Sequence, residues 1–117
     1  MILTELTPAY KSVVKSWIKN IPELEKVKNT ENLKWIEKHH ETIDAYIMKP
    51  IIKNNVEQQR ADTTLRAHYN ILLQISRGLK NTKLTDIYKA KFDKYVKKIY
   101  ADNDNNPLLG DQLENFV

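Results

Sequence analysis

The sequence predicts an all-α domain, an orthogonal bundle of four to five helices. In four separate segments, apolar residues recur at steps of three and four, the pattern of helices that bury one face. The chain has only two glycines, Gly78 and Gly110, too few for the many tight turns of an all-β fold. Its 117 residues, 41% of them hydrophobic and 29% charged, suit one folded domain with a single core.

Two helices are predicted in the first 50 residues. The first begins at Pro8, with Thr7 as its cap, and ends before Pro22. The second is capped by Asn29 or Thr30, and Pro50 ends or kinks it. Both present one apolar stripe, formed by Val13, Val14, Trp17, Ile18 and Ile21 in the first helix and by Leu33, Ile36, His40, Ile43 and Ile47 in the second.

Two further helices are predicted after a connecting segment. Residues 51–61 have weak periodicity, so we expect mostly a connection, in which one helical turn can form, and essentially no strand in the chain. Asp62 or Thr63 caps a third helix, and Gly78 suits the left-handed residue that closes it. Thr85, with Asp86 in the first turn, opens a fourth helix that stops in the polar segment 102–107. The third helix has the widest apolar arc, which predicts a central position. The predicted stripes are formed by Leu65, Tyr69, Ile71, Leu72, Leu73, Ile75, Ser76 and Leu79 in the third helix and by Tyr88, Phe92, Tyr95, Val96 and Ile99 in the fourth.

Composition also excludes several classes of site and location. The absence of cysteine excludes disulfides, thiolate metal sites and a cysteine nucleophile, and it favours an intracellular protein of the cytoplasm or nucleus. Neither a secretory signal nor a membrane-spanning run of apolar residues is visible, so we expect no membrane association. His39 and His40 are adjacent on a helix and point about 100° apart, so they cannot hold one metal ion together. We expect His40 to be a core or boundary residue, and the sequence shows no catalytic motif and no need for a cofactor.

Positive charge is concentrated in residues 60–100, which contain ten Lys or Arg against three Asp. Such an asymmetry is typical of a surface that meets a polyanion. Arg66, Asn70 and Arg77 fall in one sector of the third helix opposite its apolar face, flanked by Thr63 and Gln74, and these side-chain types read base edges and hold phosphates. On the fourth helix a lysine ridge suits backbone phosphate. The predicted DNA-binding residues are Thr63, Arg66, Asn70, Gln74, Arg77, Lys80, Lys83, Lys91, Lys94 and Lys98.

The segment Thr64-Leu65, Tyr69, Arg77-Gly78-Leu79 and Leu84-Thr85-Asp86-Ile87 resembles the core-binding domain of the tyrosine recombinase (phage integrase) family. The family pattern has a tyrosine about four residues after a threonine, whereas Tyr69 follows Thr64 by five. The resemblance covers residues 32–99 and implies a SAM-like four-helix domain that grips duplex DNA, while a separate C-terminal domain carries the nucleophilic tyrosine. It implies a viral or mobile-element source, with the protein's own catalytic domain and other recombinase protomers as further partners.

This resemblance divides the chain into residues 1–28, an N-terminal helix and linker; residues 29–101, the core-binding region; and residues 102–117, a tail towards an absent catalytic domain. The chain itself is then not an enzyme, since the family's Arg…His-x-x-Arg…Tyr set is missing. The alternative is a helical protein-interaction or assembly module without nucleic-acid binding. Such a module would bind a partner through an apolar face that contains Trp17, Trp35 and Tyr46.

Overall fold

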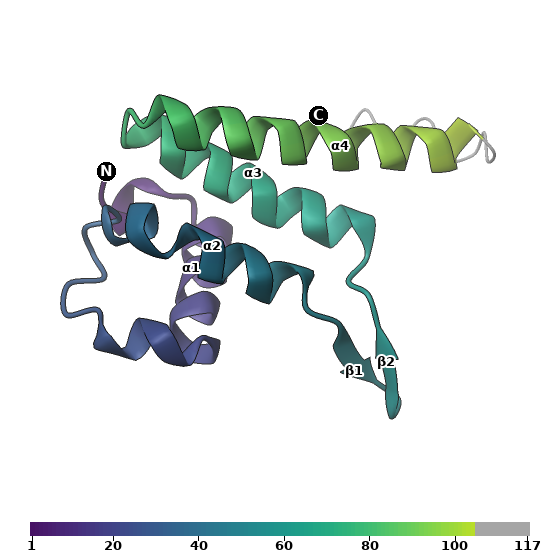
Figure 1. The fold of residues 1–117 in the computed structure, drawn as a ribbon, viewed down its shortest axis with the longest axis horizontal. Coiled ribbons are helices and arrows are strands. Elements are labelled where there is room, and N and C mark those ends of the chain that lie inside the picture. Colours follow the sequence, from purple (N-terminus) through teal and green to yellow (C-terminus); the bar gives the residue numbers. More distant parts are fainter. Residues whose placement is uncertain (105–117) are drawn as a thin grey trace.

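A computed structural model describes residues 1–104, with side chains up to Ala101. It is a mostly helical compact domain, 71% helical, with four α-helices and a small hairpin, which confirms the predicted helical class. Figure 1 shows α4 along one edge of the molecule, α3 beside it, then α2, with α1 near the N-terminus and the hairpin projecting from the body. The elements are α1 (Pro8–Asn20), α2 (Trp35–Met48), β1 (Ile51–Lys53), β2 (Val56–Gln58), α3 (Asp62–Gly78) and α4 (Thr82–Asp104), with short 3-10 turns at Leu3–Glu5 and Pro22–Lys26.

The first helix begins and ends where the sequence predicts. The Tyr10 backbone N–H donates to Oγ1 of Thr7 at 3.3 Å, and Pro8 occupies the first helical position. Pro22 follows the helix and opens a 3-10 turn that buries Leu24. The sequence alone therefore determines this element.

The second helix begins later than predicted. Its N-cap is Lys34, not Asn29 or Thr30, and no side chain caps it. Asn29 and Asn32 instead accept backbone N–H groups in the preceding turns, from Asn32 at 3.4 Å and from Lys34 at 3.1 Å respectively. Leu33 is fully buried although it precedes the helix, so the apolar stripe is continuous across the boundary.

Residues 51–58, predicted as mostly connection, form a short hairpin. Here β1 and β2 pair antiparallel, with Ile52 opposite Glu57 and Lys53 opposite Val56. Asn54 and Asn55 form the two-residue turn with φ of 54° and 62°, the left-handed conformations that a tight hairpin needs and that asparagine tolerates. With only three residues in each strand, the alternation was too short to recognise.

The boundary between α3 and α4 also differs from the prediction. Ala61, not Asp62 or Thr63, is the N-cap of α3. Gly78 is the last helical residue, and Lys80 instead takes the left-handed conformation, with φ of 59°. Backbone N–H groups of Lys80 and Asn81 donate to the carbonyls of Arg77 and Ser76 at 3.0 Å, which is a Schellman closure. A side chain at Gly78 would meet Met1, since an added Cβ lies 2.4 Å from the Met1 sulfur.

Asn81, not Thr85, opens α4. Its Oδ1 accepts the Leu84 backbone N–H at 3.1 Å, as an N-cap side chain does. Thr85 lies in the first turn and donates its hydroxyl to the Asn81 carbonyl at 2.8 Å. Of the predicted tail, residues 102–117, the first three belong to α4, and residues 105–117 lie outside the part of the chain that the structure describes.

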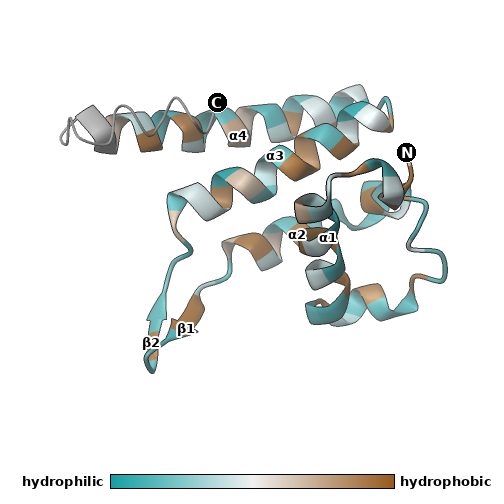
Figure 2. Cartoon of the chain, turned by 180° about the vertical axis from the view of Figure 1, so that it is seen from behind, coloured by the Kyte–Doolittle hydropathy of each residue, from teal (hydrophilic) through white to brown (hydrophobic). Residues whose placement is uncertain are grey.

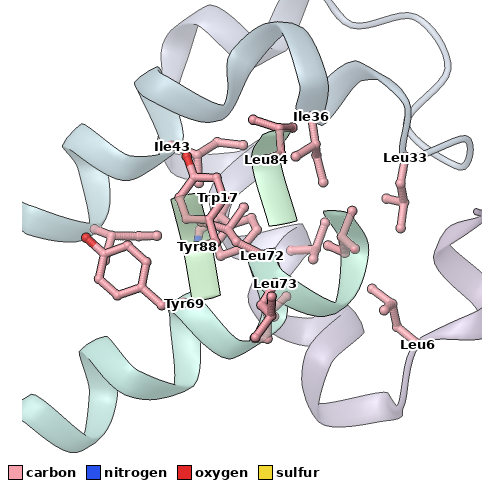
Figure 3. Close-up of a cluster of buried hydrophobic side chains, with 14 of the residues drawn as sticks. Leu6, Trp17, Leu33, Ile36, Ile43, Tyr69, Leu72, Leu73, Leu84 and Tyr88 are labelled. Carbon is pink, nitrogen blue, oxygen red and sulfur yellow. The ribbon is translucent and has the colours of Figure 1, made fainter. Parts of the chain in front are cut away.

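One hydrophobic core joins all four helices and both 3-10 turns (Figure 3). The central position of α3 is confirmed, because seven of its residues are buried, Leu65, Tyr69, Ile71, Leu72, Leu73, Ile75 and Ser76. Its closest packing is with α4. Trp17 is fully buried and donates its indole N–H to His68 Nδ1 at 2.9 Å. Among the described residues, no helix has the length and apolar character that crossing a membrane requires.

Candidate nucleic-acid interface

The structure divides the ten predicted residues into three groups. Thr63, Arg66, Asn70 and Gln74 lie together on one side of α3 and line a cavity of about 580 Å³. The opposite wall comes from α4, through residues that include Phe92. These four side chains therefore lie in a recess between helices, whereas a helix that reads a major groove presents its polar face as a ridge.

Hydrogen bonds fix part of this recess. Asn70 Nδ2 donates to the hydroxyl of Tyr10 in α1 at 2.7 Å, and Gln74 Nε2 lies 3.5 Å from Asn70 Oδ1. Tyr10 also lines the cavity, so three helices surround it. Asn70 is thereby half-buried and held, while Gln74 remains exposed.

The second group lies at the turn between α3 and α4. Arg77, Lys80 and Lys83 are all exposed, and they are separated by only six positions along the chain. Within residues 1–101 none of the three makes an ion pair, because the pairs seen there involve Lys89, Lys91 and Lys98. This turn is therefore a compact group of uncompensated positive charge.

The third group, the predicted lysine ridge, covers a stack of tyrosines. Lys91 lies 5.8 Å and 5.7 Å from the ring centres of Tyr69 and Tyr88, and the ammonium groups of Lys94 and Lys98 lie 5.5 Å and 5.4 Å from that of Tyr95. These are cation–π distances. Two of the lysines also have acidic partners, Asp44 for Lys91 and Asp62 for Lys98.

The tyrosine stack explains why lysines lie there. Tyr69 stacks on Tyr88 and on Tyr95, with ring centres 6.2 Å and 5.6 Å apart. Tyr69 donates its hydroxyl to Asp44 at 2.5 Å. Burial, followed by the nearby Asp44 carboxylate, raises the pKa of both Tyr69 and Tyr88 well above the ordinary value, so both stay neutral hydroxyl donors. The acidic partners of Lys91 and Lys98 partly offset their positive charge, and the Lys98 pair is largely exposed, so it contributes little to stability.

A row of three lysines lies on the solvent side of α4, and the sequence interpretation missed one of them, Lys97. At 100° per residue, Lys83, Lys94 and Lys97 fall within about 60° of each other on the face opposite the buried Tyr88 and Ile99. All three are exposed, and none has an ion-pair partner within residues 1–101. Lys97 was overlooked because the predicted ridge was aligned on Lys91 and Lys98, at the edge of this face. The helical period measured from the buried residues would have found it.

The histidines are structural. His40 Nδ1 lies 2.8 Å from the Tyr88 hydroxyl, which confirms the prediction of a hydrogen-bonded boundary residue. His68, which the sequence interpretation did not single out, accepts the Trp17 indole N–H. Burial, followed by the charge of Arg60, lowers the pKa of His68 to about 4, so the ring is neutral near pH 7.

The described residues thus offer binding surfaces without a recognisable catalytic set. Among them, no three His, Cys, Asp or Glu side chains lie close enough to hold a metal ion. Two features of the described residues can bind a ligand: the positive charge on the solvent side of α4, and the polar and aromatic recess beside α3. No protein-family model, curated protein or solved structure matches this chain.

Proposed function

We propose that this chain is the DNA-binding domain of a tyrosine recombinase-like protein and that it holds duplex DNA mainly by its phosphates. The contact surface, which we call the α4 face, consists of Arg77, Lys80, Lys83, Lys94 and Lys97. Its exposed lysines, which have no ion-pair partner among residues 1–101, are the observation that carries the proposal. The likeness of residues 32–99 to the core-binding domain supports the same function.

Geometry favours phosphate contact over base reading. Duplex DNA carries one charge per roughly 1.7 Å of axis, so a straight helix with lysines along one face can meet several phosphates together. The 23 residues of α4 extend about 35 Å. Lysine carries a point charge on a flexible side chain, which suits contact with phosphates whatever the base sequence. The recessed Arg66 and Asn70 are not needed for this contact.

Fluorescence anisotropy with a random-sequence duplex at several salt concentrations tests this function. The triple variant Lys83→Gln/Lys94→Gln/Lys97→Gln should bind more weakly and flatten the log–log salt slope by about 3 units, since each phosphate contact contributes about 0.9. A matched control, Lys11→Gln/Lys15→Gln/Lys19→Gln on α1, removes the same charge elsewhere. The proposal fails if duplex at high micromolar concentration and about 50 mM salt gives no signal, or if both triple variants weaken binding equally.

The hairpin favours a second candidate function, a protein-interaction module. Ile52 is 79% exposed and Val56 is 54% exposed, on a hairpin that packs little against the body (Figure 2). A short two-stranded hairpin is marginally stable alone, and a partner that covers its exposed apolar side chains would stabilise it. The aromatic face expected for this function does not form, because Trp17 is fully buried and Trp35 and Tyr46 pack against the core. Sedimentation equilibrium tests whether the chain associates with itself through the hairpin. If the parent self-associates, Ile52→Thr/Val56→Thr abolishes this association, and duplex DNA does not bind the parent, the second function replaces the first.

A further inference from the structure

The cavity beside α3 has the composition of a nucleotide site. Its volume, about 580 Å³, falls in the range of small-molecule sites. Apolar and aromatic side chains form one wall, and amide, guanidinium and carboxylate groups converge on the same space. The residues that carry the argument are Arg66, Asn70, Gln74, Phe92, Asp93 and Tyr100.

The two amides specify what the polar wall can recognise. Asn70 Nδ2 donates to the Tyr10 hydroxyl, and Asn70 Oδ1 accepts from Gln74 Nε2 at 3.5 Å, which leaves the second lone pair of that oxygen beside the second hydrogen of Nε2. An acceptor next to a donor matches the N6 amino group and N7 of adenine, the edge that Asn and Gln side chains read in nucleic acids. The Tyr10 hydrogen bond therefore orients Asn70 for one kind of base edge.

The remaining side chains complement the rest of a nucleotide. Phe92 and Tyr100 provide aromatic faces for stacking, which tolerates any base. Arg66 lies one helical turn from Asn70, about 6 Å along α3, and its guanidinium suits a phosphate. Asp93, which also lines the cavity, suits ribose hydroxyls, and Lys89 at 3.5 Å offsets its charge.

We infer that this cavity binds one adenine nucleotide, either free or as an unpaired residue of a nucleic-acid strand. Its volume of about 580 Å³ suits a ligand of the size of a single nucleotide. This inference does not rest on the α4 face, which lies on the solvent side of the same helix. It gives a shared role to Arg66, Asn70 and Gln74, three of the five α3 residues that the sequence predicts as DNA contacts.

Isothermal titration calorimetry of the full chain with AMP, GMP and adenosine tests the inference. AMP should bind more tightly than GMP. Arg66→Gln should weaken the affinity for AMP roughly tenfold or more, as expected for the loss of a charged hydrogen bond, and should leave the affinity for adenosine unchanged. Gln74→Glu removes the donor to N7 at an exposed position, so it should abolish the preference for AMP over GMP. Tyr100→Ala should weaken the affinities for both nucleotides. Lys15→Gln, at an exposed position of α1 that does not line the cavity, is the matched control.

Competition distinguishes the two sources of the nucleotide. If an oligo-dA strand displaces AMP and binds more tightly than oligo-dT, the natural ligand is an unpaired adenine in a strand; if AMP binds and neither strand competes, it is a free nucleotide. The inference is overturned if millimolar AMP and oligo-dA both fail to bind a chain that circular dichroism shows to be folded. It is also overturned if Arg66→Gln and Gln74→Glu bind AMP as the parent does. Duplex binding that AMP does not inhibit would leave the proposed function intact in either case.

Discussion

At the residue scale, polar groups inside this protein are paired across helices that lie far apart in the sequence. Asp44 of α2 accepts the hydroxyl of Tyr69 from α3 and forms an ion pair with Lys91 of α4. The hydroxyl of Tyr88 lies beside His40. Each pair satisfies a group whose burial would otherwise cost free energy, so these contacts specify how the helices are arranged.

His68 should make stability depend on pH. Its pKa is about 4 in the folded protein and 6.5 ordinarily, so between these pH values the unfolded chain binds a proton that the folded chain does not. The stability it contributes is complete above pH 6.5 and is lost as the pH falls towards 4, by about 2 kcal/mol after allowance for partial exposure. Urea unfolding of the parent and of His68→Asn at several pH values measures this. Equal slopes for both proteins between pH 4 and 6.5 would contradict the prediction.

Lys80→Gly should stabilise the protein by about 1 kcal/mol. Lys80 has a φ of 59°, a conformation that costs free energy for a residue with a Cβ and none for glycine. The urea midpoint should rise with an unchanged m-value. Lys80→Ala is the control, since it removes the same charge but keeps the strain; if it stabilises equally, charge and not conformation is the cause.

At the element scale, α3 stabilises the fold and α4 provides the surface. Seven residues of α3 are buried, and its polar side faces the cavity. In contrast, α4 lies at the edge of the molecule, so its outer face can carry lysines without any cost of burial (Figure 1). This division explains why the exposed basic side chains of the described residues gather on α4 and at its start, whereas Arg66 and Asn70 of α3 lie in a recess.

Leu72→Ala should lower the free energy of unfolding by about 2–5 kcal/mol. Leu72 is fully buried at the centre of α3, where truncation leaves a cavity between helices. Gln74→Ala, two positions along on the exposed side, should change it by less than about 0.5 kcal/mol. Chemical denaturation compares the two, and a loss below about 1 kcal/mol for Leu72→Ala would show that the site relaxes or that α3 is oriented differently.

At the scale of the whole molecule, one continuous core connects surfaces of different character. The α4 face is basic, the hairpin projects from the body with exposed Ile52 and Val56, and the cavity lies between α1, α3 and α4. Because each surface belongs to a different side of one rigid core, their roles can be changed separately by substitution.

Unfolding should be a single cooperative transition. The core cluster contains Trp17 from α1 together with buried residues of α2, α3 and α4, so no helix has a core of its own. Tryptophan fluorescence, which reports on α1 and the start of α2, and circular dichroism, which reports on all helices, should give coincident urea curves. A fluorescence transition at a lower urea concentration would mean that α1 detaches first.

The sequence by itself determines the helical class, the buried stripes and the capping of α1, because period and cap chemistry are local properties of the chain. Leu65, Leu72 and Tyr88 could be assigned to the core from spacing alone. The concentration of lysines in residues 60–100 was also visible.

Only the tertiary structure decides which polar side chains are available. The helical period places Arg66 and Asn70 on one side of α3, but it cannot reveal that α1 and α4 enclose that side. Similarly, the period cannot show that Asp44, 47 residues away, engages Lys91, while Lys97 remains unpaired within residues 1–101. Exposure and pairing depend on contacts between distant segments, so the candidate site was predicted as a list of residues and became distinct surfaces only in the folded chain.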